Sequence, residues 1–157
     1  MIEKTTVIRM LEQRRIPFSV LEYPVDEEDL SATHAAELLG LDADRVFKTI
    51  VLVGERTGYL VCVVPGTCEV DLKRAAKAVG DKAVRPLPLR DLEAVTGYIR
   101  GGCSPLGMKK AFPTFIDETA LMFDTISVSA GRRGLQIMIA PQILAELAGA
   151  VFLPLIE

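Results

Sequence analysis

Two runs of β-branched residues, joined by five turn-forming residues, constrain the fold of this chain most. The runs are VFKTIVLV (46–53) and YLVCVV (59–64), and GERTG lies between them, a pattern typical of a β-hairpin. A second hairpin is expected over 125–140, with GRRG (131–134) at its tip. Hairpins pair antiparallel, whereas helices are expected between other strands. The sequence therefore predicts an α/β (α+β) fold in which helices surround one curved, barrel-like mixed sheet.

Serine or aspartate before an apolar repeat, and glycine after it, mark the predicted helices. Ser31 and Gly40 bound one of them, and Pro141 lies in the first turn of another. The predicted helices cover 5–15, 31–40, 71–80, 88–97 and 141–149. Short strands are predicted at 17–23, 83–85, 98–102, 114–118 and 150–155.

Length and composition exclude several classes of protein. The 157 residues suit a single domain, 1–157, and the short apolar runs cannot span a membrane. The first fifteen residues lack the apolar region of a signal peptide, so we expect a cytoplasmic protein. Three irregularly spaced cysteines and one histidine predict neither a disulfide framework nor a zinc site.

Charge is distributed unevenly along the chain. Residues 1–44 carry four Lys/Arg against ten Asp/Glu, while residues 45–157 carry fourteen against eleven. This balance lacks the strongly basic character of a dedicated nucleic-acid-binding domain, so a polyanion would be bound by a local patch. Lys73, Arg74 and Lys77, on a predicted helix, are interpreted as a solvated face.

Lys48 is unusual because both faces of its predicted strand are apolar. Lys48 shares one face with Ile50 and Leu52, and Thr49 shares the other with Val51. An unpaired buried ammonium is costly. Two interpretations stay open: a lysine that reaches water along the sheet edge, and a cation that holds a phosphate or carbonyl oxygen.

The segment GGCSPLG (101–107) is rich in glycine and follows GYIR. Glycines allow close approach to the backbone, and consecutive N–H groups can bind an anion or stabilise an oxyanion. N–H groups around Gly101–Gly102 and Leu106–Gly107 are candidates for this role. The alternative is a plain tight connection. The spacing is neither that of a P-loop nor that of a dinucleotide-binding motif.

Protein nucleophiles are weakly supported. Cys103 would need His34 as its base, yet His34 lies in a predicted helix beside acidic sequence, so a small apolar loop residue is favoured. Ser104 precedes a proline and lacks the G-x-S-x-G elbow of serine hydrolases.

Two further positions have a structural and a functional interpretation. Arg132 and Arg133 lie at a hairpin tip, where they are either solvated turn residues or phosphate contacts, to which Lys109 and Lys110 could add. Tyr23 ends a predicted strand and is either half-buried or stacked on a ligand.

Four stretches, in this order, resemble the YbaK/EbsC family of free-standing editing domains, which are related to the insertion domain of bacterial prolyl-tRNA synthetases. They are RVFKTIVLV, VVPGTCEVDLKRAAKAVG, GYIRGGCSPLGMKKAFPTFID and ISVSAGRRGLQIMI, and the resemblance covers nearly the whole chain. The form GYxxGGxSPLGxKK looks most like the branch that removes cysteine from mischarged tRNA(Pro). The resemblance implies a mixed, barrel-like sheet with helices around it, and deacylation of aminoacyl-tRNA in trans without metal or cofactor.

The resemblance also implies roles for particular residues. The essential lysine of the family falls on Lys48, and its pocket tyrosine falls on Tyr23. The predicted substrate-binding set is Tyr23, Thr49, Gly101, Gly102, Ser104, Pro105, Leu106, Gly107, Ser129 and Arg133. In the cysteine-editing branch the thiol of the substrate attacks its own ester, so the enzyme need only orient it.

Some positions depart from the family pattern. Gln136 stands where some relatives carry an acid, and Leu30 and Ser31 stand where relatives can carry an aromatic. The resulting hypothesis is a trans-editing deacylase for Cys-tRNA(Pro), with the acceptor end of tRNA(Pro) and prolyl-tRNA synthetase as partners. Three alternatives stay open: a deacylase for another small aminoacyl-tRNA such as alanyl-tRNA, a non-catalytic module that binds tRNA ends, and a Cys103 thiol enzyme.

Overall fold

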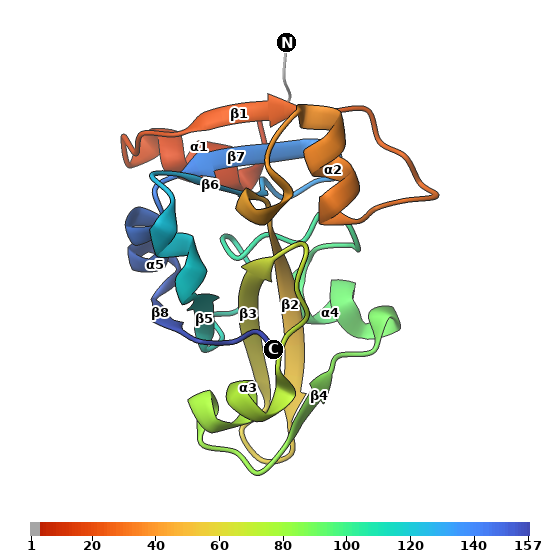
Figure 1. Cartoon of the computed structure of the whole chain (residues 1–157), viewed down its shortest axis with the longest axis vertical. Helices are drawn as coiled ribbons and strands as arrows, with labels where there is room; N and C mark the ends of the chain where they lie inside the picture. The colour runs from red at the N-terminus through yellow and green to blue at the C-terminus, as the bar shows by residue number, and fades with distance from the viewer. Residues whose placement is uncertain (1–3) are drawn as a thin grey trace.

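Residues 4–157, which the computed structural model describes, form two β-sheets with helices around them (Figure 1). The three-stranded sheet has the order β1-β7-β6 and is antiparallel. The five-stranded sheet has the order β4-β2-β3-β5-β8 and is mixed, because β5 runs parallel to both β3 and β8. The strands are β1 (Ser19–Glu22), β2 (Phe47–Gly54), β3 (Tyr59–Pro65), β4 (Val84–Pro86), β5 (Thr114–Asp117), β6 (Ile126–Ser129), β7 (Leu135–Ile139) and β8 (Ala150–Leu153).

The sequence predicted the mixed α/β architecture and both hairpins, which the structure confirms. It predicted one curved sheet, whereas the structure has two, connected at an isolated parallel bridge between Val46 and Ser127. The prediction of a strand over 98–102 is wrong. The N–H of Gly102 donates to the carbonyl of Ile99 at 2.9 Å, and Gly101 has φ +84°, so this segment closes a turn.

The helices predicted over 31–40 and 71–80 begin and end at the residues that their caps indicated. The helix predicted over 5–15 ends at Gln13, and the one predicted over 88–97 begins only at Leu92. The side chains of Thr5, Ser31 and Asp71 accept hydrogen bonds from N–H groups of the first turns. Gly40 and Gly80 close two helices in the left-handed conformation, which glycine adopts without steric cost. The helices are α1 (Thr6–Gln13), α2 (Ala32–Leu39), α3 (Leu72–Val79), α4 (Leu92–Thr96) and α5 (Pro141–Ala148). None of the helices within residues 4–157 has the length and hydropathy needed to cross a bilayer.

Apolar clusters cover both faces of the five-stranded sheet. One cluster fills the space between the two sheets and includes Val7 and Leu11 of α1 and Leu144 of α5. The other lies on the opposite face, where Ala75 and Ala76 of α3 pack on the sheet. This double cover explains why β2 and β3 are apolar on both faces, and it limits where a polar side chain can reach solvent.

Asp117 is a buried carboxylate that stabilises the C-terminal part of the fold. It is 1% exposed, and it accepts hydrogen bonds from the N–H of Leu155 at 2.9 Å and from the N–H of Thr119 at 3.1 Å. We expect Asp117→Ala to lower the free energy of unfolding by about 3 kcal/mol, because these donors lose their acceptor. Urea unfolding measures this change, and Asp124→Ala is an exposed control. A loss below about 1 kcal/mol would show that these bonds contribute little.

Candidate active site

A cleft of about 380 Å³ lies where the two sheets part, along one edge of β2. On its other edge β2 pairs with β3 from Phe47 to Val53. On the cleft side, Val46 bridges to β6, and β4 pairs only with residues 52–54. The edge is therefore open around Thr49. A volume of this size suits a small organic group.

The open edge exposes main-chain groups of Thr49 to the cleft. The N–H of Gly54 donates to the carbonyl of Gly58, so the main-chain N–H and C=O groups of the even-numbered β2 residues point towards β3. The N–H of Leu87 donates to the carbonyl of Val51 at 3.0 Å, so the main-chain groups of the odd-numbered residues point towards the cleft side. Strand pairing within residues 4–157 thus leaves the N–H and C=O of Thr49 without a partner on this side. The Thr49 hydroxyl is also buried without a hydrogen-bond partner among these residues. Such orphaned groups are rare in folded proteins, and a bound ligand would satisfy them.

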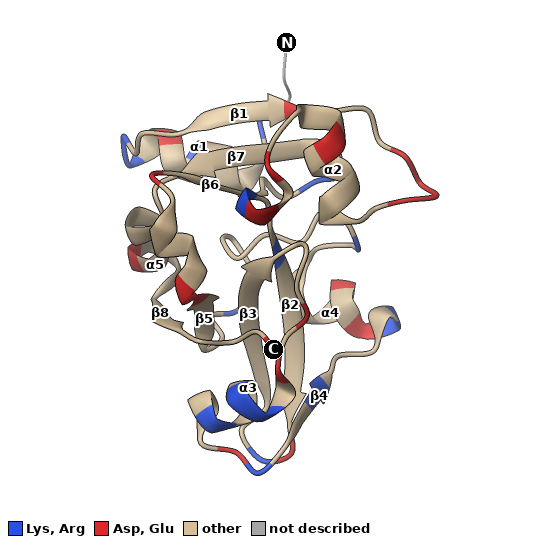
Figure 2. Ribbon diagram, viewed as in Figure 1, with Lys and Arg blue, Asp and Glu red and all other residues tan. Residues whose placement is uncertain are grey.

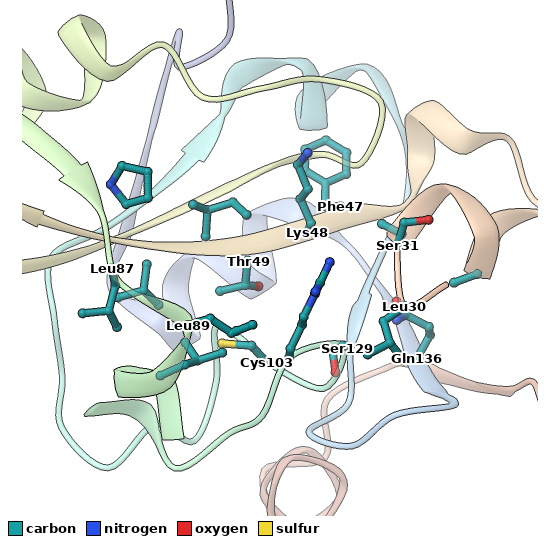
Figure 3. A pocket seen from close by; sticks show the side chains of 18 of the residues that line it. Leu30, Ser31, Phe47, Lys48, Thr49, Leu87, Leu89, Cys103, Ser129 and Gln136 are labelled. Atoms are coloured by element: carbon teal, nitrogen blue, oxygen red, sulfur yellow. The ribbon is translucent and has the colours of Figure 1, made fainter. Parts of the chain in front are cut away.

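Lys48 leaves β2 on the side opposite Thr49, at the rim of the cleft (Figure 3). Its side chain is 22% exposed, and its Nζ lies 3.3 Å from Glu69 Oε1 and 3.5 Å from the carbonyl of Gly66. Both distances exceed those of strong charge-assisted hydrogen bonds. The Glu69 side chain is 84% exposed. Both interpretations of Lys48 therefore apply: its side chain reaches water at the sheet edge, and its ammonium can bind an additional anionic group.

The facing wall comes from segments distant in sequence (Figure 3). The loop after α4 contributes Arg100, Gly101 and Cys103, and the segment between β1 and α2 contributes Leu30. The remaining lining includes Tyr23, Ser31, Leu87, Leu89, Leu92, Ser129 and Gln136.

The electrostatic character of the cleft favours an anion. Its described lining carries the cations Lys48 and Arg100 and no carboxylate. Gln136 is neutral, and its Oε1 accepts a hydrogen bond from the Ser127 hydroxyl at 2.7 Å. Across residues 4–157, no three His, Cys, Asp or Glu side chains are grouped as a metal site.

Gly101 and Gly102 allow the loop after α4 to pack closely against the β6–β7 hairpin. A Cβ added at Gly102 would lie 3.1 Å from backbone atoms of Arg132 and Arg133. A Cβ at Gly101 would lie 3.2 Å from Leu30. The Arg133 Nε donates to the carbonyl of Arg100 at 2.8 Å. The two motifs noticed in the sequence are therefore in direct contact, and glycine permits this approach.

The structure brings some of the predicted residues to the cleft and places others behind it. Tyr23, Lys48, Thr49, Gly101 and Ser129 line the cleft. The predicted residues outside its lining are Gly102, Ser104, Pro105, Leu106, Gly107 and Arg133. Their roles in substrate binding stay predictions.

The second half of the glycine loop packs inward. The N–H of Leu106 donates to Ser104 Oγ at 3.2 Å, and the Tyr98 hydroxyl donates to the carbonyl of Leu106 at 2.6 Å. A Cβ at Gly107 would lie 2.7 Å from the Tyr98 hydroxyl oxygen. Because the N–H groups of Gly102 and Leu106 already donate within the loop, neither is free to bind an anion in this conformation.

Sequence reasoning missed Arg100 and the apolar floor of the cleft. Arg100 belongs to the motif, yet an arginine before two glycines resembles an ordinary solvated loop residue. The floor residues Leu87, Leu89 and Leu92 reach the cleft only because β4 pairs with β2 from a distant part of the chain.

Cys103 lines the cleft, but its environment does not activate it. Burial raises the pKa of the Cys103 thiol to about 11, so it is protonated at neutral pH. His34 Nε2 lies 3.2 Å from Asp26, and its Nδ1 lies 3.5 Å from Glu37. The chain's single histidine is thus surrounded by carboxylates. These contacts argue against a Cys–His pair.

Comparisons with known proteins show the family and the fold of the chain. The family model "Aminoacyl-tRNA editing domain" matches residues 26–147. A protein of Enterococcus faecalis named "Putative Cys-tRNA(Pro)/Cys-tRNA(Cys) deacylase EbsC" is 51% identical over 150 residues, which cover 96% of this chain and 92% of that protein. A proline–tRNA ligase of Shouchella clausii is 29% identical over 115 residues, which cover 73% of this chain and 20% of the ligase. A crystal structure described as "a putative trans-editing enzyme for prolyl tRNA synthetase" matches with a TM-score of 0.83 and 26% identity, covering 99% of both chains.

Proposed function

Because the chain belongs to the aminoacyl-tRNA editing domain family, we propose that it is a deacylase that removes cysteine from mischarged Cys-tRNA(Pro) in trans. One observation carries the choice of mechanism. The described lining of the cleft presents a cation, Lys48, and the orphaned polar groups of Thr49, but no histidine or carboxylate that could activate a nucleophile. Such a site suits a substrate that supplies its own nucleophile.

In the proposed reaction the cysteinyl thiol attacks the carbonyl carbon of its own ester. A carbon–sulfur bond forms, the bond from the carbonyl carbon to the ribose oxygen breaks, and the thiol proton passes through water to that oxygen. The products are a cysteine thiolactone and free tRNA. Holding the thiol close to the carbonyl supplies much of the acceleration.

Lys48 and Thr49 have complementary roles in this proposal. The Lys48 ammonium at the rim stabilises negative charge that develops on the ester or is carried by the terminal phosphate. The N–H of Thr49, which strand pairing leaves without a partner on the cleft side, fixes the ester carbonyl. Tyr23 and Gly101 close the sides around the terminal adenosine.

The size of the cleft limits its selectivity. In this proposal the cleft of about 380 Å³ holds both the amino acid and the terminal ribose, so its volume limits the room for the amino-acid side chain. A floor of Leu87, Leu89 and Leu92 offers no polar group with which to distinguish them. Alanyl-tRNA is therefore a second substrate candidate. We also propose a cytoplasmic reaction coupled to prolyl-tRNA synthetase, supported by the likeness to part of a proline–tRNA ligase.

Single-turnover deacylation tests the proposal. Purified protein in excess over Cys-tRNA(Pro) should release free tRNA far faster than buffer, while Pro-tRNA(Pro) should keep its ester. Ala-tRNA(Pro), run in parallel, measures the selectivity. Protein that binds the tRNA but leaves every ester intact would instead be a non-catalytic module that binds tRNA ends.

We predict that Cys103→Ser keeps deacylation within about threefold of wild type, because a thiol with a pKa of about 11 is not the nucleophile. The rate constant on Cys-tRNA(Pro) measures this, with treatment of wild type by iodoacetamide at neutral pH as a second readout. Loss of activity in the serine variant, together with rapid alkylation of Cys103, would support the thiol-enzyme alternative.

A further inference from the structure

Five exposed cations gather at the end of the molecule opposite the three-stranded sheet. Figure 2 shows blue segments on α3 and β4 at this end, with short red segments in the adjoining turns, whereas the loop between β1 and α2 carries red without blue. We call these residues the basic end: Arg56, Lys73, Lys77, Lys82 and Arg85. Within residues 4–157 none of them forms an ion pair with a carboxylate. Their charges are therefore free to meet a partner.

Asp81 holds the backbone of two of these residues, Arg56 and Lys82, close together. Its carboxylate accepts hydrogen bonds from the N–H groups of Arg56 and Thr57, both at 2.9 Å, and from the N–H of Lys82 at 2.7 Å. These main-chain donors, with Arg56 first, hold the pKa of Asp81 below its usual range. The tip of the β2–β3 hairpin is thus tied to the residues that follow α3.

Two other elements complete the basic end. On α3, Ala75 and Ala76 are buried against the sheet, so Lys73 and Lys77 project from the solvent side, one turn apart. On β4, Arg85 is exposed and pairs in register with Val53 of β2.

The basic end continues directly into the cleft. Pro86, the residue after Arg85, lines the cleft. Val53, the register partner of Arg85, lies four positions after Thr49 on β2, which corresponds to about 13 Å along the strand. The acidic residues Asp26 to Asp29 precede Leu30, which lines the facing wall. A polyanion with one end in the cleft is therefore repelled on the side of α2 and attracted towards β4 and α3.

We propose that the basic end binds the phosphate backbone of the tRNA acceptor stem while the aminoacylated 3′ end occupies the cleft; this inference rests on the proposed function. Lysines and arginines spread over three elements suit the phosphates of a duplex and carry no base readout. The interaction would be independent of stem sequence and sensitive to salt.

The test combines a triple variant with two substrates. Lys73→Gln, Lys77→Gln and Arg85→Gln together remove three exposed charges, and no buried contact is lost. We expect kcat/KM on Cys-tRNA(Pro) to fall about tenfold or more at low salt, and the slope of log kcat/KM against log salt to become shallower by about 2 to 3. On cysteinyl-adenosine, which has no stem, kcat/KM should equal that of wild type.

A matched control removes three exposed charges from the opposite end of the molecule. Lys4→Gln, Arg9→Gln and Arg14→Gln lie on or beside α1 and should leave both substrates and the salt slope unchanged. The inference is overturned if the basic-end variant keeps the wild-type rate and slope on Cys-tRNA(Pro), or if it loses activity equally on cysteinyl-adenosine.

Failure of the proposed function is distinguishable from failure of this inference. If wild type cleaves neither ester, the deacylase proposal fails, and fluorescence anisotropy with uncharged tRNA decides the inference. A clear loss of tRNA affinity in the basic-end variant alone supports it. Equal affinity of wild type and variant for tRNA overturns the inference. Displacement of tRNA by polyglutamate at equal charge concentration also overturns it, because that result would indicate an acidic protein as the partner of the basic end.

Discussion

Lys48→Ala is expected to lower kcat/KM for Cys-tRNA(Pro) by at least about 100-fold, the size of effect typical when one stabilising group is removed from developing charge. The reason is geometric. Lys48 is one of two cations in the described lining of the cleft. Within residues 4–157 its side-chain partner is Glu69, which lies outside that lining and is largely exposed. Single-turnover kinetics with the variant in excess measure the effect.

The fold should tolerate this change, which keeps the kinetic result interpretable. Removing a partly exposed ammonium from a solvated pair should change the free energy of unfolding by no more than about 1 kcal/mol. Lys48→Arg keeps the charge and should restore part of the activity, whereas Lys4→Ala, at the far end of the molecule, should have no effect. Wild-type kcat/KM in a folded Lys48→Ala protein would exclude the assigned role of this residue.

Gly102→Ala is expected to lower kcat/KM about tenfold to 100-fold although Gly102 does not line the cleft. The new Cβ would lie 3.1 Å from the backbone of Arg132 and Arg133, and backbone atoms cannot rotate away as a flexible side chain can. The loop that carries Arg100 and Gly101 must therefore shift relative to β2. Small displacements of positioning groups have large kinetic costs.

Gly58→Ala is the matched control for Gly102→Ala. Gly58 has φ +77° and open space around it, at a hairpin tip away from the cleft. Alanine there should cost about 1 kcal/mol of stability through backbone strain and leave kcat/KM unchanged. Gly102→Ala should cost a similar amount of stability, about 1 to 3 kcal/mol, so the difference between the two variants lies in activity. Wild-type activity in Gly102→Ala would mean that the loop position is not critical.

Local signals in the sequence predicted most of the elements. The two hairpins and the helix caps at Ser31 and Asp71 depend on residues within a few positions of one another, so they could be recognised before the structure. The division into two sheets depends on pairings between distant segments, such as β4 with the end of β2 and Val46 with Ser127. No local pattern specifies such pairings.

In the candidate site, too, local sequence signals could be recognised in advance, whereas features that depend on distant segments could not. Lys48 was noticeable because a charge interrupted an apolar strand. The orphaned groups of Thr49 arise only because β2 has an open edge, which depends on the partner strands. Conversely, the N–H groups of Gly102 and Leu106 looked available in the sequence, but hydrogen bonds within the folded loop use them.

A comparison of two esters on the same tRNA tests most directly whether this cleft edits by positioning a substrate that supplies its own nucleophile. Cys-tRNA(Pro) and Ser-tRNA(Pro) differ by sulfur in place of oxygen, so they should bind alike but differ in nucleophilic power. We predict that the wild-type protein cleaves the cysteinyl ester at least about 100-fold faster, with thiolactone or its hydrolysis product released alongside free tRNA. Equal rates on the two esters, or cleavage of neither, would contradict that prediction.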